Sequence, residues 1–460
     1  MERVLPKTID YTDVLPLAVE SKARRRTFFP VNGQSFTASG ANIIRIDISA
    51  DALLDTQHSY LRFTLTSDAA KTAGLDFAGG HGFIKRLRIE QSGTILEDIQ
   101  SYNRLMGAIV LPAQSGYEHN QERGITENIH AGGSDISANN LNTSGLTPTA
   151  TARAGAGQML GYGNTGNAYF IAGQTATFSI PLNSGIFNNE KLIPLMLMSA
   201  PLTIEIELAP LSDPPCFEDT AATDFPVYNV RYIANLVEVG QDVAQQLRMV
   251  QEMSGGVLTL AGQTYRHFTG AITATTGDQV INVPARVKSM KSIFFASQNA
   301  DGAAQNNYFV SPSGNMKLNE YQLKIGSVVY PPTPVKCGFG TGAVGDVVSK
   351  RGEALMELAK AFGSVGGTKG MGRLSQVLAY RTEDAKINQG EAHSFSPFGL
   401  DLEAFQRVAI ESGVNTADRS LPISLILNYA NAPTATNVDV YVLADALFYI
   451  NSDGSMSVSV

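Results

Sequence analysis

The sequence predicts an all-β protein made of two tandem eight-stranded antiparallel β-sandwiches, each interrupted by one helix. Three observations support this prediction. Many short segments alternate apolar and polar residues, the second half repeats the order of segments in the first, and a segment of helical periodicity occurs at a matching place in each half. Alternation places successive side chains on opposite faces of a strand, so one face of each segment is expected to be buried.

Length and composition agree with this class. The chain has 460 residues, more than one ordinary domain contains, with 43 glycines and no tryptophan. No run of about 18 apolar residues occurs, so we expect no membrane-spanning helix. The formal net charge of −8 argues against a surface that coats nucleic acid. Cys216 and Cys337 lie in different halves and outside any C-x-x-C pair, which gives no disulfide framework or zinc knuckle.

The first half shows the strand pattern from Thr27 onward. Ile44, Ile46 and Ile48 alternate with polar residues, and residues 61–65 repeat the alternation. A hairpin is predicted over residues 83–99, because a Ser-Gly pair separates two strand-like runs there. These segments therefore predict strands with one face against a core.

The period then changes. Residues 99–110 carry apolar side chains at helical spacing, and Pro112 marks the end of the helix. Residues 113–174 are rich in Gly, Asn, Ser and Thr and have almost no periodicity, so we expect a long surface loop. Strand patterns resume at residues 175–181, 201–209 and 227–239.

The second half follows the same order. It has strands from residue 257, a hairpin turning at Gly326-Ser327, a helix near residues 355–362, and further strands near residues 392–396, 422–430 and 438–450. Local matches pair residues 201–209 with 422–430, 230–234 with 440–444, and Phe178-Ser179 with Phe395-Ser396. A repeat of roughly 200 residues indicates a duplicated domain. The predicted division is an arm (1–26), a first domain (27–240), a linker (241–256) and a second domain (257–460).

Eight antiparallel strands in two packed sheets form a jelly roll, which occurs in viral capsid domains, lectins and cupins. We place the helix between the sixth and seventh strands of each half. A cupin needs clustered histidine ligands, whereas the six histidines here are scattered and form no H-x-H pair. A lectin-like tandem sandwich is the alternative to a capsid protein, but such proteins usually display a row of exposed aromatic side chains, and tryptophan is absent.

A resemblance to known proteins lies in several stretches, namely residues 55–65 (DTQHSYLRFTL), 83–99 (FIKRLRIEQSGTILEDI), 102–110, 178–209 and 398–416. These stretches resemble one family, the double jelly-roll major capsid proteins of tailless icosahedral DNA viruses. The resemblance implies a homotrimer whose six jelly rolls form a pseudo-hexagonal capsomer, which tiles an icosahedral virion shell, often over an internal lipid membrane. It also implies neighbouring capsomers and minor capsid or penton proteins as partners, assembly inside the host cell, no cofactor and no enzymatic activity.

The arm holds the one candidate contact site. Its basic cluster consists of Lys22, Arg24, Arg25 and Arg26. Such a cluster can bind acidic lipid head groups or nucleic acid, although an ordinary solvated terminus explains it equally well. We expect it to face the particle interior, where it would contact the membrane or neighbouring subunits, without sequence-specific recognition of nucleic acid.

No catalytic, cofactor or metal site is predicted. Residues 340–345 match G-x-G-x-x-G, but the prolines at 331–334 precede them where a dinucleotide site needs a buried strand. Asp55, His58 and Ser59 contain the residue types of a nucleophilic triad. Neighbours along a strand point to opposite faces, so the serine and the histidine are not expected to meet.

Overall fold

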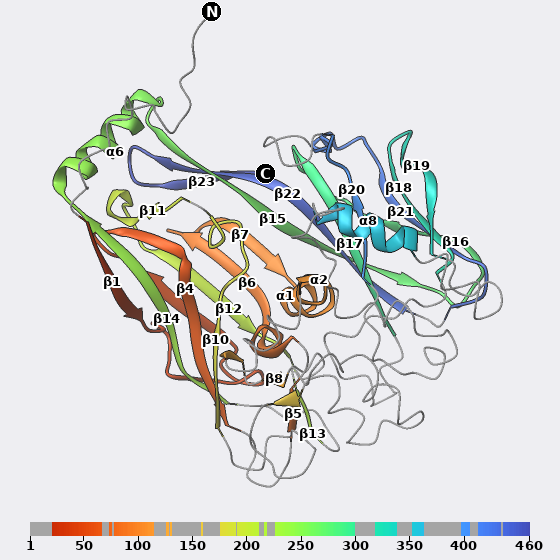
Figure 1. Ribbon diagram of the computed structural model, residues 1–460, viewed down its shortest axis with the longest axis horizontal. Helices are drawn as coiled ribbons and strands as arrows, with labels where there is room; N and C mark the ends of the chain where they lie inside the picture. Colours follow the sequence, from red (N-terminus) through yellow and green to blue (C-terminus); the bar gives the residue numbers. More distant parts are fainter. Residues whose placement is uncertain are drawn as a thin grey trace, which may run out of the picture.

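The computed structural model describes residues 21–66, 73–75, 78–114, 126–127, 129–130, 158–159, 175–189, 191–210, 216–218, 226–299, 318–337, 352–362, 397–404, 413–433 and 436–460. These residues form two antiparallel sandwiches that lie side by side, with helix α6 at one end (Figure 1). No helix among the described residues has the length and apolar content needed to cross a membrane.

The first sandwich has two main sheets. One has the strand order β1 (Ser21–Phe28), β14 (Val227–Val239), β4 (Leu53–Thr66) and β10 (Thr175–Ile180), with β2 (Ser35–Phe36) on β14 and β11 (Ile193–Pro194) on β4. The other has the order β3 (Ile43–Ile48), β12 (Leu202–Leu208), β6 (Ile84–Gln91) and β7 (Thr94–Gln100). Two small ribbons pair β5 (Ala73–Leu75) with β13 (Cys216–Glu218) and β8 (Ile129–His130) with β9 (Gln158–Met159).

The second sandwich repeats this arrangement. Its first sheet has the order β15 (Val257–Ile272), β22 (Thr436–Asn451), β17 (Met290–Asn299) and β20 (Phe398–Asp401), with β23 (Met456–Ser459) on β22. Its second sheet has the order β16 (Gly277–Asn282), β21 (Ile423–Tyr429), β18 (Glu320–Ile325) and β19 (Val328–Lys336). Within the described residues, both sandwiches therefore place their main strands at the same sheet positions, which is the jelly-roll order.

Short helical segments link the sheets. The first sandwich has η1 (Gly79–Phe83), η4 (Leu195–Leu197) and a continuous helical stretch of α1 (Tyr102–Arg104), η2 (Leu105–Val110) and α2 (Leu111–Gln114). Helix α8 (Gly352–Ala361) belongs to the second sandwich, and α6 (Gln241–Met253) joins the two. The all-β class and the interrupting helices are confirmed.

The position of the helix differs from the prediction, which placed it between the sixth and seventh strands. Among the main strands, it follows the fifth and precedes the sixth, in β7–α1–β10 and again in β19–α8–β20. The fifth and sixth strands lie in different sheets of the same sandwich, so the helix is part of a connection that crosses between the sheets.

The start of the first strand also differs from the prediction, which placed it at Thr27. Strand β1 begins at Ser21 and pairs with β14 along its whole length, from Ser21 opposite Val239 to Phe28 opposite Tyr232. The predicted arm of residues 1–26 thus overlaps a strand. The sequence pattern did not predict the start of this strand, because β1 is exposed from Ser21 to Arg26 and therefore has no alternation of apolar and polar residues there.

Other predictions have mixed outcomes. The hairpin turning at Gly326-Ser327 is confirmed by β18 and β19, and the 201–209 and 422–430 match is confirmed because β12 and β21 occupy the same sheet position. The predicted strand near 392–396 and the G-x-G-x-x-G segment lie outside the described residues, as does most of loop 113–174.

One described residue of that loop, Glu127, is buried and accepts the Gly80 N–H at 3.0 Å. Helix α6 lies in the predicted linker, while separate folding of the two domains stays a prediction.

A three-ring aromatic cluster recurs in both cores. Phe63 on β4 stacks on Phe178 on β10 with centroids 5.1 Å apart, and Phe83 closes the cluster. In the second sandwich Phe295 on β17 stacks on Phe398 on β20 at 5.0 Å, and the Tyr321 ring packs edge-on against both. The structural counterpart of Phe178 is therefore Phe398.

Truncation of either stacked phenylalanine should destabilise the fold to a similar degree. We expect Phe178→Ala and Phe398→Ala each to lower the free energy of unfolding by about 3–5 kcal/mol, because both rings are fully buried. Denaturant titration measures the effect. Phe29→Ala is the control, since that ring is 64% exposed and should lose far less. A loss confined to one core would contradict the equivalence.

Candidate functional site: the contact between the two sandwiches

The two sandwiches share a continuous hydrophobic core. Their buried apolar side chains form one cluster that extends from Phe36 in the first to Ile450 in the second. The long strands β15 and β22 of the second sandwich run back toward the first, and β23 lies beside β7 (Figure 1). The contact therefore holds the two sandwiches at one relative angle.

The backbones touch at two glycines. A Cβ atom at Gly262, on β15, would lie 2.5 Å from the Gly185 carbonyl oxygen, and a Cβ atom at Gly185 would lie 2.6 Å from the Gln263 carbonyl oxygen. Contacts of under 3.0 Å to backbone atoms leave no room for a side chain. Close by, the Asn189 side-chain amide donates to the Ala261 carbonyl at 2.7 Å. Glycine is thus required here for close approach.

Glu97 on β7 organises this approach. Its carboxylate accepts the Gly185 N–H at 2.9 Å and the Ile186 N–H at 3.4 Å, and it also has a hydrogen bond with Thr264 of the second sandwich. Burial raises the pKa of Glu97, and these hydrogen bonds only partly offset that effect. A raised carboxyl pKa means that the Glu97 contribution to stability decreases as pH rises above the ordinary Glu value.

A buried ion pair crosses the contact elsewhere. Arg104 of α1 donates from Nε to Asp439 Oδ2 at 3.1 Å, and His267 Nε2 lies 2.9 Å from Asp439 Oδ1. Burial alone would raise the pKa of Asp439, but the His267 hydrogen bond and the Arg104 charge together hold it below its ordinary value. The Tyr441 hydroxyl adds a bond to the Ser101 carbonyl at 2.9 Å. These groups connect the interrupting helix of one sandwich to the sheet of the other.

The hairpin between β22 and β23 forms a third connection. The Gly454 carbonyl accepts the Ser199 N–H and the Gln91 side-chain amide, both at 3.0 Å, while Gln91 Oε1 accepts the Met456 N–H at 2.6 Å. Gly454 has a φ of +79°, and an added Cβ would lie 2.5 Å from the Ser199 nitrogen. Only glycine fits this turn against the first sandwich.

A cleft of about 700 Å³ lies where the sandwiches diverge. Asn183, Asn188, Tyr265 and Phe362 are among its lining residues, and Lys291 pairs with Glu403 at 2.6 Å in its wall. The Lys291 charge is thus already neutralised in this wall. Among the described residues, no three metal-ligating side chains gather.

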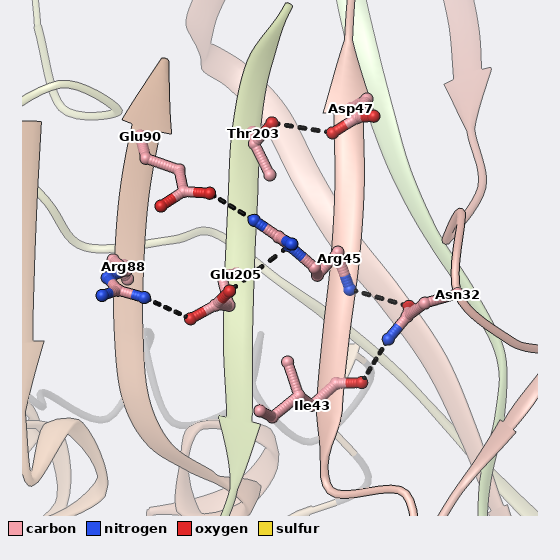
Figure 2. A network of polar contacts seen from close by, with 8 residues as sticks. All are labelled: Asn32, Ile43, Arg45, Asp47, Arg88, Glu90, Thr203 and Glu205. Carbon is pink, nitrogen blue, oxygen red and sulfur yellow. Dashed lines mark hydrogen bonds and ion pairs between the residues drawn. The ribbon is translucent and has the colours of Figure 1, made fainter. Parts of the chain in front are cut away.

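A charge network covers the outward face of the first sandwich (Figure 2). Arg45 on β3 contacts Glu90 on β6 and Glu205 on β12, and Arg88 reaches Glu205 at 2.8 Å. The Asn32 side chain donates to the Ile43 carbonyl at 2.8 Å and accepts the Arg45 N–H at 3.0 Å. Opposite charges on neighbouring strands contribute to pairing and oppose a shift in register.

The structure places the predicted basic cluster on β1. Arg24 pairs with Glu238 at 3.1 Å, and Arg25 donates to the Tyr60 hydroxyl at 2.9 Å. Arg26 lies over the Phe28 ring, with its guanidinium carbon 4.9 Å from the centroid. Lys22 lies opposite Glu238 in the strand register. Neighbouring groups of the same sandwich thus engage the three arginines, although the strand remains exposed.

The triad residue types do not form a triad. Asp55 Oδ2 lies 2.7 Å from Nδ1 of the exposed His58, whereas Ser59 is buried and its Oγ accepts the Asn235 N–H at 2.9 Å. Serine and histidine therefore face different environments, as the strand periodicity predicts.

Sequence reasoning missed the residues of the contact between the sandwiches. Glu97 and Asp439 are acidic residues within segments predicted to be strands. An acidic residue at a position expected to be buried is a sequence signal that could have indicated this contact. Their partners Gly185 and Arg104 lie 88 and 335 positions away, respectively. No local pattern identifies such partners.

Comparisons with known proteins establish the fold class. No protein-family model and no curated protein matches the sequence. Among solved structures, a chain of the PBCV-1 virus capsid matches with a TM-score of 0.60 and 11% identity over 98% of this chain and 99% of that one. The Faustovirus major capsid protein matches with a TM-score of 0.58 and 8% identity over 98% and 93%. A chain of the Sputnik virophage gives 0.52 and 10% over 100% and 93%. The chain has the double jelly-roll fold of these capsid proteins.

Asp439→Asn should weaken the contact in a pH-dependent way. We expect a loss of about 3 kcal/mol in the free energy of unfolding at pH 7, because Arg104 would lose its buried counter-charge. The pKa of Asp439 is lowered, so its stabilisation is present above the ordinary Asp pKa and is lost as pH falls through the lowered value. Unfolding measured at pH 7 and pH 3 should show a smaller difference between variant and wild type at pH 3. The exposed Asp51→Asn is the control.

Gly262→Val should force the sandwiches apart. The added side chain collides with the Gly185 carbonyl, and overpacking of this kind costs about 1–3 kcal/mol. Thermal unfolding and limited proteolysis would report the loss of the contact. Gly352→Ala is the matched control, because an added Cβ there meets nothing within 4 Å. Equal behaviour of the two variants would contradict the close approach.

Proposed function

We propose that this protein is the major capsid protein of an icosahedral virus and that its chains form homotrimeric capsomers of the virion shell. The observation that supports this most directly is the pair of topologically equivalent jelly rolls, held together by a shared core. Three such chains related by rotation present six similar sandwiches, and closed cyclic symmetry is the usual arrangement in homo-oligomers. A near-sixfold tile can fill hexagonal positions in a shell.

Rigidity of the double sandwich suits such a tile. The glycine contact, the Arg104–Asp439 pair and the hairpin at Gly454 fix the two sandwiches at three separate places. A flexible joint would allow different angles between sandwiches and would give irregular tiles. This geometry favours a structural role over an enzymatic one, and the jelly-roll neighbours are capsid proteins.

We further propose that the basic strand segment faces the particle interior. Lys22 and the three arginines are exposed on β1, the edge strand of its sheet. Each basic residue near an acidic leaflet contributes about 1 kcal/mol, and salt screens this attraction over ~10 Å. Such contacts are weak for one chain and become strong when many copies act together. An internal membrane and minor capsid or penton proteins are the partners that fit this proposal.

Purified protein tests the oligomer directly. Light scattering coupled to size exclusion is expected to give three times the chain mass of 49.1 kDa, and negative-stain images should show hexagonal outlines. A stable monomer at micromolar concentration, with specific retention on a sugar-coated matrix, would instead favour the lectin-like alternative. The Gly262→Val variant serves as a comparison, because loosened sandwiches should give irregular outlines.

A further inference from the structure

Helix α6 exposes an apolar surface. Met253 is 88% exposed, Met249 is 58% exposed and Val250 is 50% exposed. The three side chains lie within two turns of each other near the C-terminal end of the helix. We call these three residues the α6 apolar face.

The side of α6 that meets the protein is only partly covered, because Val243, Ala244 and Leu247 are half-buried. The helix has 13 residues, and helices of this length gain most of their stability by packing an amphipathic face. Yet Gln251 is its one buried residue, and Gln251 Nε2 donates to the Ile450 carbonyl at 3.0 Å. The side of α6 that meets the protein thus combines half-buried apolar side chains with one polar contact, whereas the α6 apolar face is exposed.

The chain itself enters beside α6. Ser21 lies opposite Val239 in the sheet register, and Gly240 is the N-cap of α6. Ser21, which follows residues 1–20, is therefore adjacent to the start of α6. A helix of 13 residues is about 20 Å long, whereas 20 extended residues reach about 60 Å. The segment is long enough to follow α6 from end to end.

The composition of residues 1–20 suits a packed segment. The sequence MERVLPKTIDYTDVLPLAVE includes Val14, Leu15, Leu17 and Val19 close to the point of entry. Solvated tails are poor in such side chains. Pro6 and Pro16 interrupt a helix, so an extended segment laid against α6 is the conformation that the sequence favours.

Charge argues against a lipid surface as the partner. Asp242 and Glu252 give α6 more negative than positive charge, since Arg248 is its one basic residue. Interfacial helices that bind acidic membranes carry Lys and Arg on their polar face. An apolar segment of protein therefore fits the α6 apolar face better than an acidic membrane does.

We propose that residues 1–20 pack along α6 of their own chain and cover the α6 apolar face. The inference concerns the folded chain and does not depend on the proposed shell. It assigns the segment before β1 to an intramolecular contact and leaves the exposed β1 arginines as the interior-facing group.

Methionine oxidation tests this contact, because the rate of sulfoxide formation follows exposure. Purified full chain and a chain lacking residues 1–20 would be treated with dilute hydrogen peroxide, and each methionine would be followed by peptide mass spectrometry. Met249 and Met253 should oxidise several-fold faster in the truncated chain. Met356 on α8 is the matched control, since it is 49% exposed and far from α6 in sequence, and its rate should not change.

A substitution keeps the test valid if the truncated chain folds poorly. Leu17→Asp should also speed oxidation of Met249 and Met253, whereas Thr12→Asp, at a polar position of the same segment, should have little effect. Equal rates in the full and truncated chains would overturn the proposal. Protection that appears only at high protein concentration would overturn it in favour of a second copy, and protection only with phosphatidylserine vesicles would overturn it in favour of lipid.

Discussion

The approach of Gly185 to Gly262 is the contact on which the arrangement of the whole molecule depends. It lets two backbones touch with no side chain between them. Glu97, Asn189 and Thr264 can then reach across, because a few ångströms more would break each of their hydrogen bonds. The shared core closes around this point, so two sandwiches that each have a complete jelly-roll order behave as one body.

Two buried carboxylates at this contact differ in their electrostatics. Asp439 has cationic neighbours in Arg104 and His267, which lower its pKa. Glu97 has only N–H and hydroxyl donors, and burial raises its pKa. The surroundings of Asp439 therefore favour its ionised form, whereas burial opposes ionisation of Glu97, whose hydrogen bonds hold the Gly185 backbone in place. A contact that combines the two gains a defined geometry as well as burial.

The outer surfaces show how the sheets avoid wrong partners. Arg45, Glu205 and Arg88 place alternating charges across the neighbouring strands β3, β12 and β6, and a shift of two residues between β12 and β6 would bring Glu90 opposite Glu205 (Figure 2). Strand β1 is the edge of its sheet and carries Lys22 and three arginines, which discourages pairing with another edge. Helix α6, in contrast, exposes Met249, Val250 and Met253 close together near its C-terminal end.

The sequence by itself determined the class of the fold, because alternation, hairpin turns and helical spacing are local properties that need only neighbouring residues. Ile44, Ile46 and Ile48 fixed the buried face of one strand, and residues 201–209 matched their structural equivalents at 422–430. The match of Phe178 with Phe395 was wrong, because sheet pairing places Phe398 there. Tertiary structure alone decided the contact between the sandwiches. Arg104 and Asp439 meet across 335 positions, and such pairing depends on how whole sheets pack, which leaves no period in the sequence.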